Sequence, residues 1–155
     1  MRTTMITVSQ SDANPAKRQP FLRQVIPGKS VALNQSLKIL LVDDSSMDQM
    51  IAGEMLRKLG HEVDVAGNGA EAIQAVEHKY YDILIMDVQM PEMDGIQVAR
   101  LIRNRYGGLF RIIFVTGSPP NIYRKMCFDA GGDDFLTKPL TIARLQASIN
   151  RAMWP

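Results

Sequence analysis

The sequence has a single cysteine, no apolar run long enough to cross a membrane, and a polar N-terminus without the apolar core of a secretory signal. Because Cys127 is alone, it cannot form an internal disulfide or a metal site built from several cysteines. The missing apolar runs predict a protein without a membrane span, and we expect it to be cytoplasmic. After residue 36 the sequence contains no internal repeat and no low-complexity segment.

The length of 155 residues predicts one domain with a sizeable core, and the formal net charge of +2 is divided unevenly along the chain. Residues 1–36 carry five basic residues and one acidic residue, together with three prolines. We expect them to be a disordered basic extension. Residues 37–155 carry 13 basic and 15 acidic residues, so we expect a folded domain there that does not bind nucleic acid.

Strand-like and helix-like segments alternate through residues 37–155. The predicted strands are short apolar runs at 37–42, 62–66, 81–87, 111–116 and 135–137. The predicted helices lie at about 46–59, 69–78, 96–103, 121–130 and 141–152. Such alternation predicts an α/β fold, a doubly wound five-stranded parallel sheet with five helices on its two faces.

Polar residues mark the starts of several predicted helices. The run Ser45-Ser46-Met47-Asp48 has the spacing of a capping box, in which the first and fourth residues satisfy free backbone N–H groups. Asn68 and Thr141 stand at two further starts.

Five polar side chains follow apolar strands, namely Asp43, Asp44, Asp87, Thr116 and Lys138. Right-handed crossovers bring the carboxyl ends of parallel strands to one edge, where ligands of such sheets bind. Three carboxylates repel each other unless protons or a hard cation neutralise them. The sequence therefore predicts a divalent metal beside a reactive carboxylate.

Magnesium suits this predicted edge because it prefers oxygen ligands and keeps several waters, and manganese could substitute for it. Asp44 and Asp87 could bind the ion directly, Asp43 could hold one of its waters, and the backbone carbonyl of Gln89 could complete the shell. A carboxylate beside a metal, a hydroxyl and the ammonium of Lys138 suits phosphoryl transfer to form an aspartyl phosphate.

Four motifs at these strand ends resemble those of response-regulator receiver domains. They are Lys38-Ile39-Leu40-Leu41-Val42-Asp43-Asp44, Asp87-Val88-Gln89-Met90-Pro91-Glu92-Met93-Asp94-Gly95, Phe114-Val115-Thr116-Gly117 and Phe135-Leu136-Thr137-Lys138-Pro139. The resemblance covers roughly residues 37–153, in order and spacing, and implies the flavodoxin-like receiver fold. Each motif alone is a weak signal, but the four together are highly specific.

The resemblance implies that Asp87 is the phosphoacceptor and that a histidine kinase or a histidine phosphotransfer protein is the donor. It also implies that Thr116 and Lys138 contact the phosphoryl group. Asp43, Asp44 and the Gln89 carbonyl would serve magnesium.

Further implications of the resemblance concern conformation. The Lys138–Pro139 bond would be cis. Phe135 matches the switch aromatic, which would fill space vacated when Thr116 moves toward the phosphoryl group. The output surface would comprise the helix at 121–130, the strand of Phe135 and the helix at 141–152. In this family that surface commonly mediates dimers or contacts with a downstream protein.

Several alternatives stay open from the sequence. A magnesium-dependent phosphohydrolase with an aspartate nucleophile would have two aspartates separated by one residue, whereas Asp43 and Asp44 are adjacent. A flavodoxin-like cofactor binder would need a Ser/Thr/Gly-rich phosphate loop after the first strand. A receiver could also signal without phosphate. We expect a signalling module, not an enzyme, that is either a stand-alone receiver or a fragment of a hybrid histidine kinase.

Overall fold

The computed structural model describes residues 35–154, so the expected basic extension over residues 1–36 lies outside the described residues except at its last two positions. The strands are β1 (Lys38–Val42), β2 (Glu62–Ala66), β3 (Ile83–Asp87), β4 (Arg111–Thr116) and β5 (Asp134–Thr137). The helices are α1 (Ser46–Lys58), α2 (Gly69–His78), α3 (Gly95–Tyr106), α4 (Pro120–Asp129) and α5 (Ile142–Met153), with a short 3-10 helix, η2 (Gly107–Leu109), after α3. Within residues 35–154 no helix is both long and apolar enough to cross a membrane.

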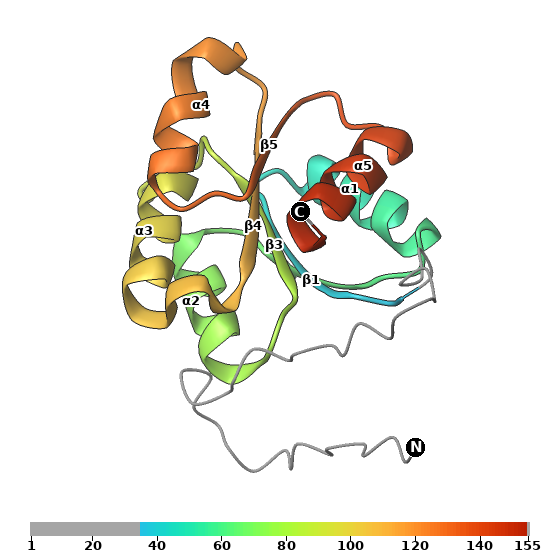
Figure 1. Cartoon of the computed structure of the whole chain (residues 1–155), viewed down its shortest axis with the longest axis horizontal. Coiled ribbons are helices and arrows are strands. Elements are labelled where there is room, and N and C mark those ends of the chain that lie inside the picture. Colours follow the sequence, from blue (N-terminus) through green and yellow to red (C-terminus); the bar gives the residue numbers. More distant parts are fainter. Residues whose placement is uncertain (1–34, 155) are drawn as a thin grey trace.

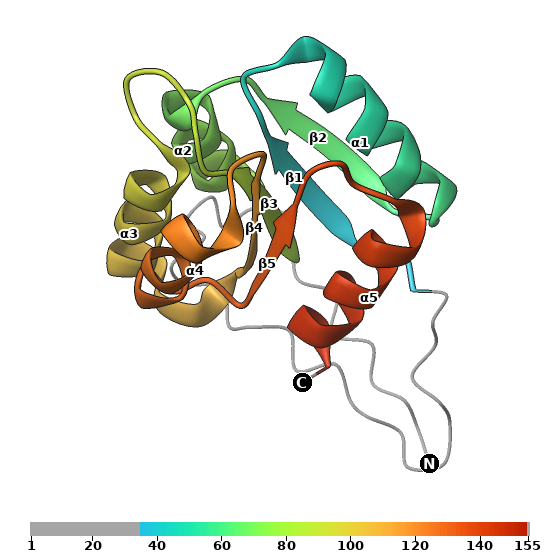
Figure 2. The ribbon, with the colours of Figure 1, turned by 90° about the horizontal axis from the view of Figure 1, so that it is seen from above.

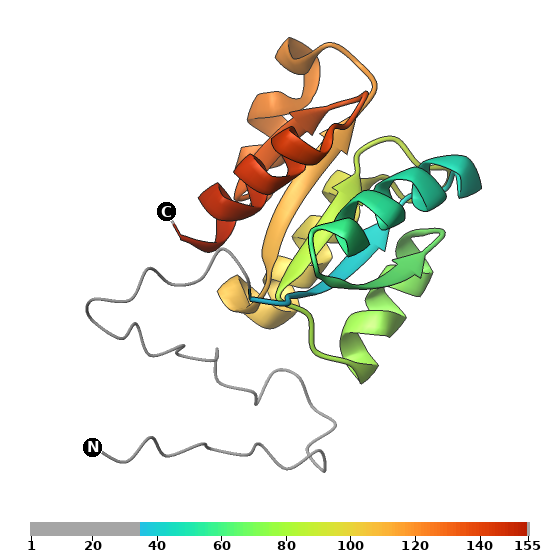
Figure 3. The ribbon, with the colours of Figure 1, turned by 90° about the vertical axis from the view of Figure 1, so that its right-hand side faces the viewer.

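The five strands form one parallel sheet in the order β2-β1-β3-β4-β5 (Figure 2). Helices α1 and α5 cover one face, and α2, α3 and α4 cover the other (Figures 1 and 3). This arrangement confirms the predicted doubly wound α/β fold. The strand order reverses between β1 and β3, and the crevice at such a reversal is where ligands of these sheets bind.

The core has two parts because alternate residues of each strand point to opposite faces of the sheet. Leu40 and Val42 of β1 join the cluster that α2 and α3 cover. Ile39 and Leu41 of the same strand join the cluster that α1 and α5 cover. Every residue of β3 is buried, as expected for a central strand covered on both faces.

Side-chain caps position the helices relative to the strand ends. Ser45, Asn68 and Thr141 each accept a hydrogen bond from the backbone N–H three residues later, at 3.3, 2.8 and 3.2 Å. Asp94 caps α3 in the same way at 2.8 Å, a role that the sequence analysis did not assign to it. These contacts satisfy backbone donors that the first turn of a helix leaves free.

Candidate functional site

Three carboxylates meet at the carboxyl edge of the sheet. Asp43 and Asp44 follow β1, Asp87 ends β3, and each offers an oxygen within 4.8 Å of the other two. The pairing of Val42 with Met86 makes the two strand ends neighbours. Asp43 and Asp87 are only 4% and 6% exposed, whereas Asp44 is exposed. The structure thus brings together the three carboxylates that the sequence assigned to a metal.

Burial raises the pKa of Asp87 to about 6, although Lys138 acts in the opposite direction; the negative charges of Asp43 and Asp44 raise it further. Even beside the Lys138 ammonium, ionised Asp87 is therefore less favourable here than in water, and a further cation would stabilise it. The donor set consists of carboxylate oxygens, the ligands that magnesium and manganese prefer. Both the concentrated negative charge and the oxygen donors of these residues therefore fit a hard divalent cation.

Lys138 reaches this group from the loop after β5. Its Nζ lies 2.8 Å from Asp48 Oδ2, 3.1 Å from Asp43 Oδ2 and 3.7 Å from Asp87 Oδ2. Burial lowers the pKa of Lys138, but the hydrogen bonds to Asp48 and Asp43 together with the negative charges of Asp87 and Asp43 raise it, and the net change is upward. The ammonium therefore stays charged and lies within reach of any group attached to Asp87.

Asp48 is a site residue that sequence reasoning missed. The Ser45–Asp48 spacing predicted a capping box, but only half of it forms, because Ser45 accepts from the Asp48 N–H while the Ser45 N–H donates to Asp43 Oδ1 at 2.9 Å. The Asp48 carboxylate binds Lys138 instead. No local pattern signals this contact, since the two residues are 90 positions apart.

Thr116 and Gln89 flank the carboxylates. Thr116 ends β4, is fully buried, and its Oγ1 accepts a hydrogen bond from the Ser118 N–H at 3.1 Å. The backbone N–H of Gln89 donates to Asp87 Oδ1 at 3.4 Å. The Gln89 side chain contacts Ser118 at 2.9 Å and Tyr123 of α4 at 3.2 Å. Gln89 therefore links the carboxylate edge to α4.

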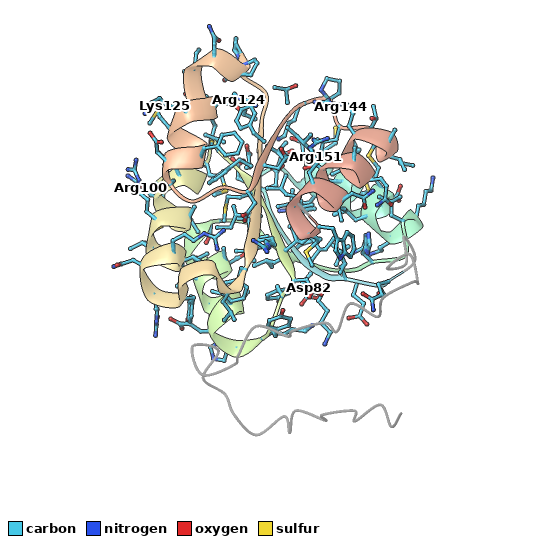
Figure 4. The ribbon with its side chains drawn as sticks, viewed as in Figure 1. Asp82, Arg100, Arg124, Lys125, Arg144 and Arg151 are labelled. Carbon is cyan, nitrogen blue, oxygen red and sulfur yellow. The ribbon has the colours of Figure 1, made fainter. Side chains whose placement is uncertain are left out.

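Phe135 lies in β5 and is buried, in the cluster that also holds Phe114. The structure describes this one position of the ring, so its predicted switching role stays a prediction. The Lys138–Pro139 peptide bond is cis. Arg144 lies on α5 (Figure 4). It donates to the carbonyls of Thr137 and Pro139, both at 2.7 Å, and so holds the backbone on each side of Lys138.

A cleft of about 390 Å³ opens beside the carboxylates. Its polar wall contains Asp43, Asp48, Asp87 and Lys138. Its apolar walls come from strands β1, β3 and β4, from α1 and from the loop between β5 and α5. The buried acidic group is thus accessible from outside along one side of the sheet edge. A small anionic substrate could approach Asp87 by this route.

The family model of the response regulator receiver domain matches residues 39–150. The chain belongs to this family. The receiver is 39% identical over 127 residues to hybrid signal transduction histidine kinase G of Dictyostelium discoideum, a match that covers 79% of this chain and 4% of the kinase. It is 34% identical over 114 residues to the transcriptional regulatory protein CrdR of Helicobacter pylori, covering 74% of this chain and 54% of that protein.

Two solved structures match this chain along nearly the whole of their own length. The receiver domain of sensor histidine kinase PA1611 from Pseudomonas aeruginosa, which holds a magnesium ion in its active-site cleft, matches with a TM-score of 0.71 and 34% identity over 78% of this chain and 100% of its own. The chemotaxis protein CheY4 of Vibrio cholerae matches with a TM-score of 0.71 and 26% identity, over 76% and 99% of the two chains. The receiver spans only 4% to 16% of the first three kinases that it matches.

Proposed function

We propose that Asp87 accepts a phosphoryl group from the phosphohistidine of a histidine kinase or of a histidine phosphotransfer protein. The observation that carries this proposal is the juxtaposition of the Lys138 ammonium, 3.7 Å from Asp87 Oδ2, with a carboxylate that belongs to a group of three. Membership in the receiver family, whose matched relatives include histidine kinases and a transcriptional regulatory protein, supports it.

In the proposed reaction a carboxylate oxygen of Asp87 attacks phosphorus, and the P–N bond of the donor breaks as the imidazole leaves with the electron pair. Lys138 stabilises negative charge on the phosphoryl oxygens, and the Thr116 hydroxyl donates a hydrogen bond to one of them. Magnesium or manganese, bound by Asp43, Asp44, Asp87 and the Gln89 carbonyl, would supply the remaining charge neutralisation. The product is an acyl phosphate on Asp87.

Phosphorylation would be read out at the surface of α4, β5 and α5. Two features support this face. The Gln89 side chain, two residues past Asp87, is hydrogen bonded to Tyr123 of α4. The apolar side chains of Ile122 and Met126 on α4 are 55% and 45% exposed. The same helix carries Arg124 and Lys125 (Figure 4). A second receiver or a downstream protein could cover this apolar surface.

The proposed switch involves Thr116 and Phe135. Attached phosphoryl oxygens would draw Thr116 inward, and the equilibrium would shift only by the difference in contacts between the two conformations. Comparing amide spectra of protein treated with acetyl phosphate with those of Asp87→Asn under the same conditions tests this step. Unchanged amide signals around Thr116 and Phe135 on phosphorylation would contradict it.

The kinase relatives favour a place in a phosphorelay, either as the receiver of a hybrid kinase or as a separate receiver that passes phosphate to a histidine phosphotransfer protein. A magnesium-dependent phosphohydrolase is not favoured by any feature of the described residues. The cytoplasmic location expected from the sequence stays a prediction.

The decisive experiment is incubation of the purified protein with magnesium and phosphoramidate, followed by intact-mass measurement and mapping of the modified peptide. We expect one phosphoryl adduct, located on Asp87, and its loss when magnesium is removed with a chelator. Asp87→Asn should show no adduct. Asp129→Asn, which removes a carboxylate from an exposed Lys125–Asp129 pair on α4, is the matched control and should react like the wild type. A wild-type protein that never acquires the adduct contradicts the proposal.

A further inference from the structure

The ammonium of Lys138 is closest to the carboxylate that lies outside the predicted metal site. Asp48 Oδ2 is 2.8 Å away, whereas Asp43 Oδ2 is 3.1 Å away and Asp87 Oδ2 is 3.7 Å away. Only the first two distances are those of hydrogen bonds. In this conformation Lys138 is held by α1 more closely than by the residue at which phosphate would be attached.

The Asp48 carboxylate does not form the helix-capping hydrogen bond that its position on α1 predicts. The backbone N–H that a capping-box carboxylate would accept from is already bonded to Asp43. The side chain of Asp48 is 40% exposed, and its oxygen is not part of the group formed by Asp43, Asp44 and Asp87. Its described ionic partner is therefore the lysine, and metal binding does not account for it.

A phosphoryl group on Asp87 would add oxygens that compete with Asp48 for the same ammonium. Hydrogen bonds between two charged groups are about twice as strong as neutral ones, so the Asp48–Lys138 contact opposes movement of Nζ toward Asp87. The pair lines the cleft, where Lys138 is only 24% exposed and screening by water is incomplete.

We propose that Asp48 is a positioning residue that holds Lys138 toward α1 in the unphosphorylated receiver and thereby slows phosphoryl acceptance by Asp87. This inference rests on the proposed function of Asp87. It assigns to the chain a built-in restraint on its own reactive lysine. The restraint is released when phosphoryl oxygens replace the Asp48 carboxylate as the partner of Nζ.

The conservative variant Asp48→Asn tests the direction of the effect. The amide keeps an oxygen that accepts from Lys138 but removes the charge. With phosphoramidate and magnesium, the P–N bond breaks, the Asp87–phosphorus bond forms, and the nitrogen leaves as ammonia. We expect this variant to be phosphorylated about three to ten times faster than the wild type, because the competing bond loses its charge assistance. A purely structural role for Asp48 predicts a slower reaction.

Three further variants separate the restraint from a general effect of charge. Asp48→Glu keeps the carboxylate and should react at nearly the wild-type rate. Asp129→Asn makes the same change in another Asp–Lys pair, where Lys125 Nζ lies 2.7 Å from Asp129, and should not alter the rate. Glu54→Gln removes an exposed charge elsewhere on α1 and should also leave it unchanged.

A double-mutant cycle with Lys138→Gln identifies the route of the effect. If Asp48 acts through Lys138, the change caused by Asp48→Asn should disappear when the lysine is absent. The affinity for beryllofluoride with magnesium, a phosphoryl mimic, is measured for all four proteins by calorimetry. This equilibrium reading remains usable where phosphorylation becomes slow. We expect tighter binding in Asp48→Asn alone and no difference between the two proteins lacking Lys138.

Failure of this inference can be distinguished from failure of the proposed function. A folded Asp48→Asn that reacts no faster than the wild type, or an effect that persists undiminished without Lys138, overturns the inference and leaves the proposed function intact. If the wild type forms no adduct on Asp87, the proposed function fails, and the inference fails with it. Circular dichroism of each variant confirms that its helices are retained.

Discussion

Replacing Asp87 with asparagine should stabilise the receiver when no divalent cation is present. Asp87 is 6% exposed and shares the sheet edge with two other carboxylates. Burial raises its pKa from 3.8 to about 6, against the attraction of Lys138. At neutral pH the folded protein must therefore hold an ionised group that would be better accommodated in the unfolded chain. An asparagine has the same shape without the charge.

The size of the effect follows from the two pKa values. A difference of about two pKa units corresponds to about 3 kcal/mol of unfolding free energy. Burying the asparagine amide on folding also costs desolvation free energy, which offsets part of this difference. We therefore expect Asp87→Asn to raise the unfolding free energy by about 2 kcal/mol at pH 7, or the melting temperature by about 8 °C. The folded-state pKa is the higher one. The gain should therefore be full above pH 6 and disappear as the pH falls toward 4.

Urea unfolding in the presence of a chelator, at pH 7.5 and again at pH 4.5, measures this gain. Magnesium added at 100 times its dissociation constant should stabilise the wild type by about 2.7 kcal/mol and the variant by much less. Asp129→Asn controls for the loss of a negative charge at an exposed site. A metal-free Asp87→Asn protein that is no more stable than the wild type at pH 7.5 would refute the reasoning about buried charge.

Three other predictions use different parts of the structure. A side chain at Gly95 would overlap the carbonyl oxygen of Asp87, so Gly95→Ala should lower the unfolding free energy by about 3 kcal/mol or more and weaken magnesium binding, as measured by urea unfolding and calorimetry. Burial lowers the pKa of His61 in the folded protein below its unfolded value of 6.5, so protonation at lower pH favours the unfolded chain. The unfolding free energy should therefore be highest above about pH 6.5 and decrease below it. In urea unfolding, this decrease between about pH 7.5 and 5.5 should be smaller for His61→Asn than for the wild type. Arg144→Ala removes the donors to the carbonyls on both sides of Lys138 and should lower the unfolding free energy, measured with urea, by about 1 to 2 kcal/mol. Arg144→Lys should not restore this stability, because a lysine ammonium does not have the planar fork of donors of arginine.

Much of the fold could be predicted because its signals are local. Apolar runs of strand length alternate with helical periodicity, and Ser45, Asn68 and Thr141 cap helices where the sequence placed their starts. The third strand is two residues shorter than predicted and α3 is longer at both ends, since element ends depend on contacts beyond the local pattern. The 3-10 helix η2 was missed because two consecutive glycines predict the end of a helix and not a further helical turn.

The edge carboxylates could be predicted for a topological reason. Parallel strands joined by right-handed crossovers all end on one side, so Asp43, Asp44 and Asp87 could be assigned to the same edge once their strands were recognised. The strand order then decides which ends are neighbours, and the pairing of β1 with β3 places these three within 4.8 Å.

By itself the sequence determined the class of fold, the sheet edge that holds the candidate site and the residue types gathered there, because periodicity and strand ends are properties of short segments. Only the tertiary structure decided which carboxylates bind Lys138, and besides Asp43 it placed Asp48 there, whose local spacing predicted a helix cap. It likewise joined Gln89 to Tyr123. Such contacts link residues far apart in the chain, and their partners depend on distances of a few ångströms that no local pattern encodes.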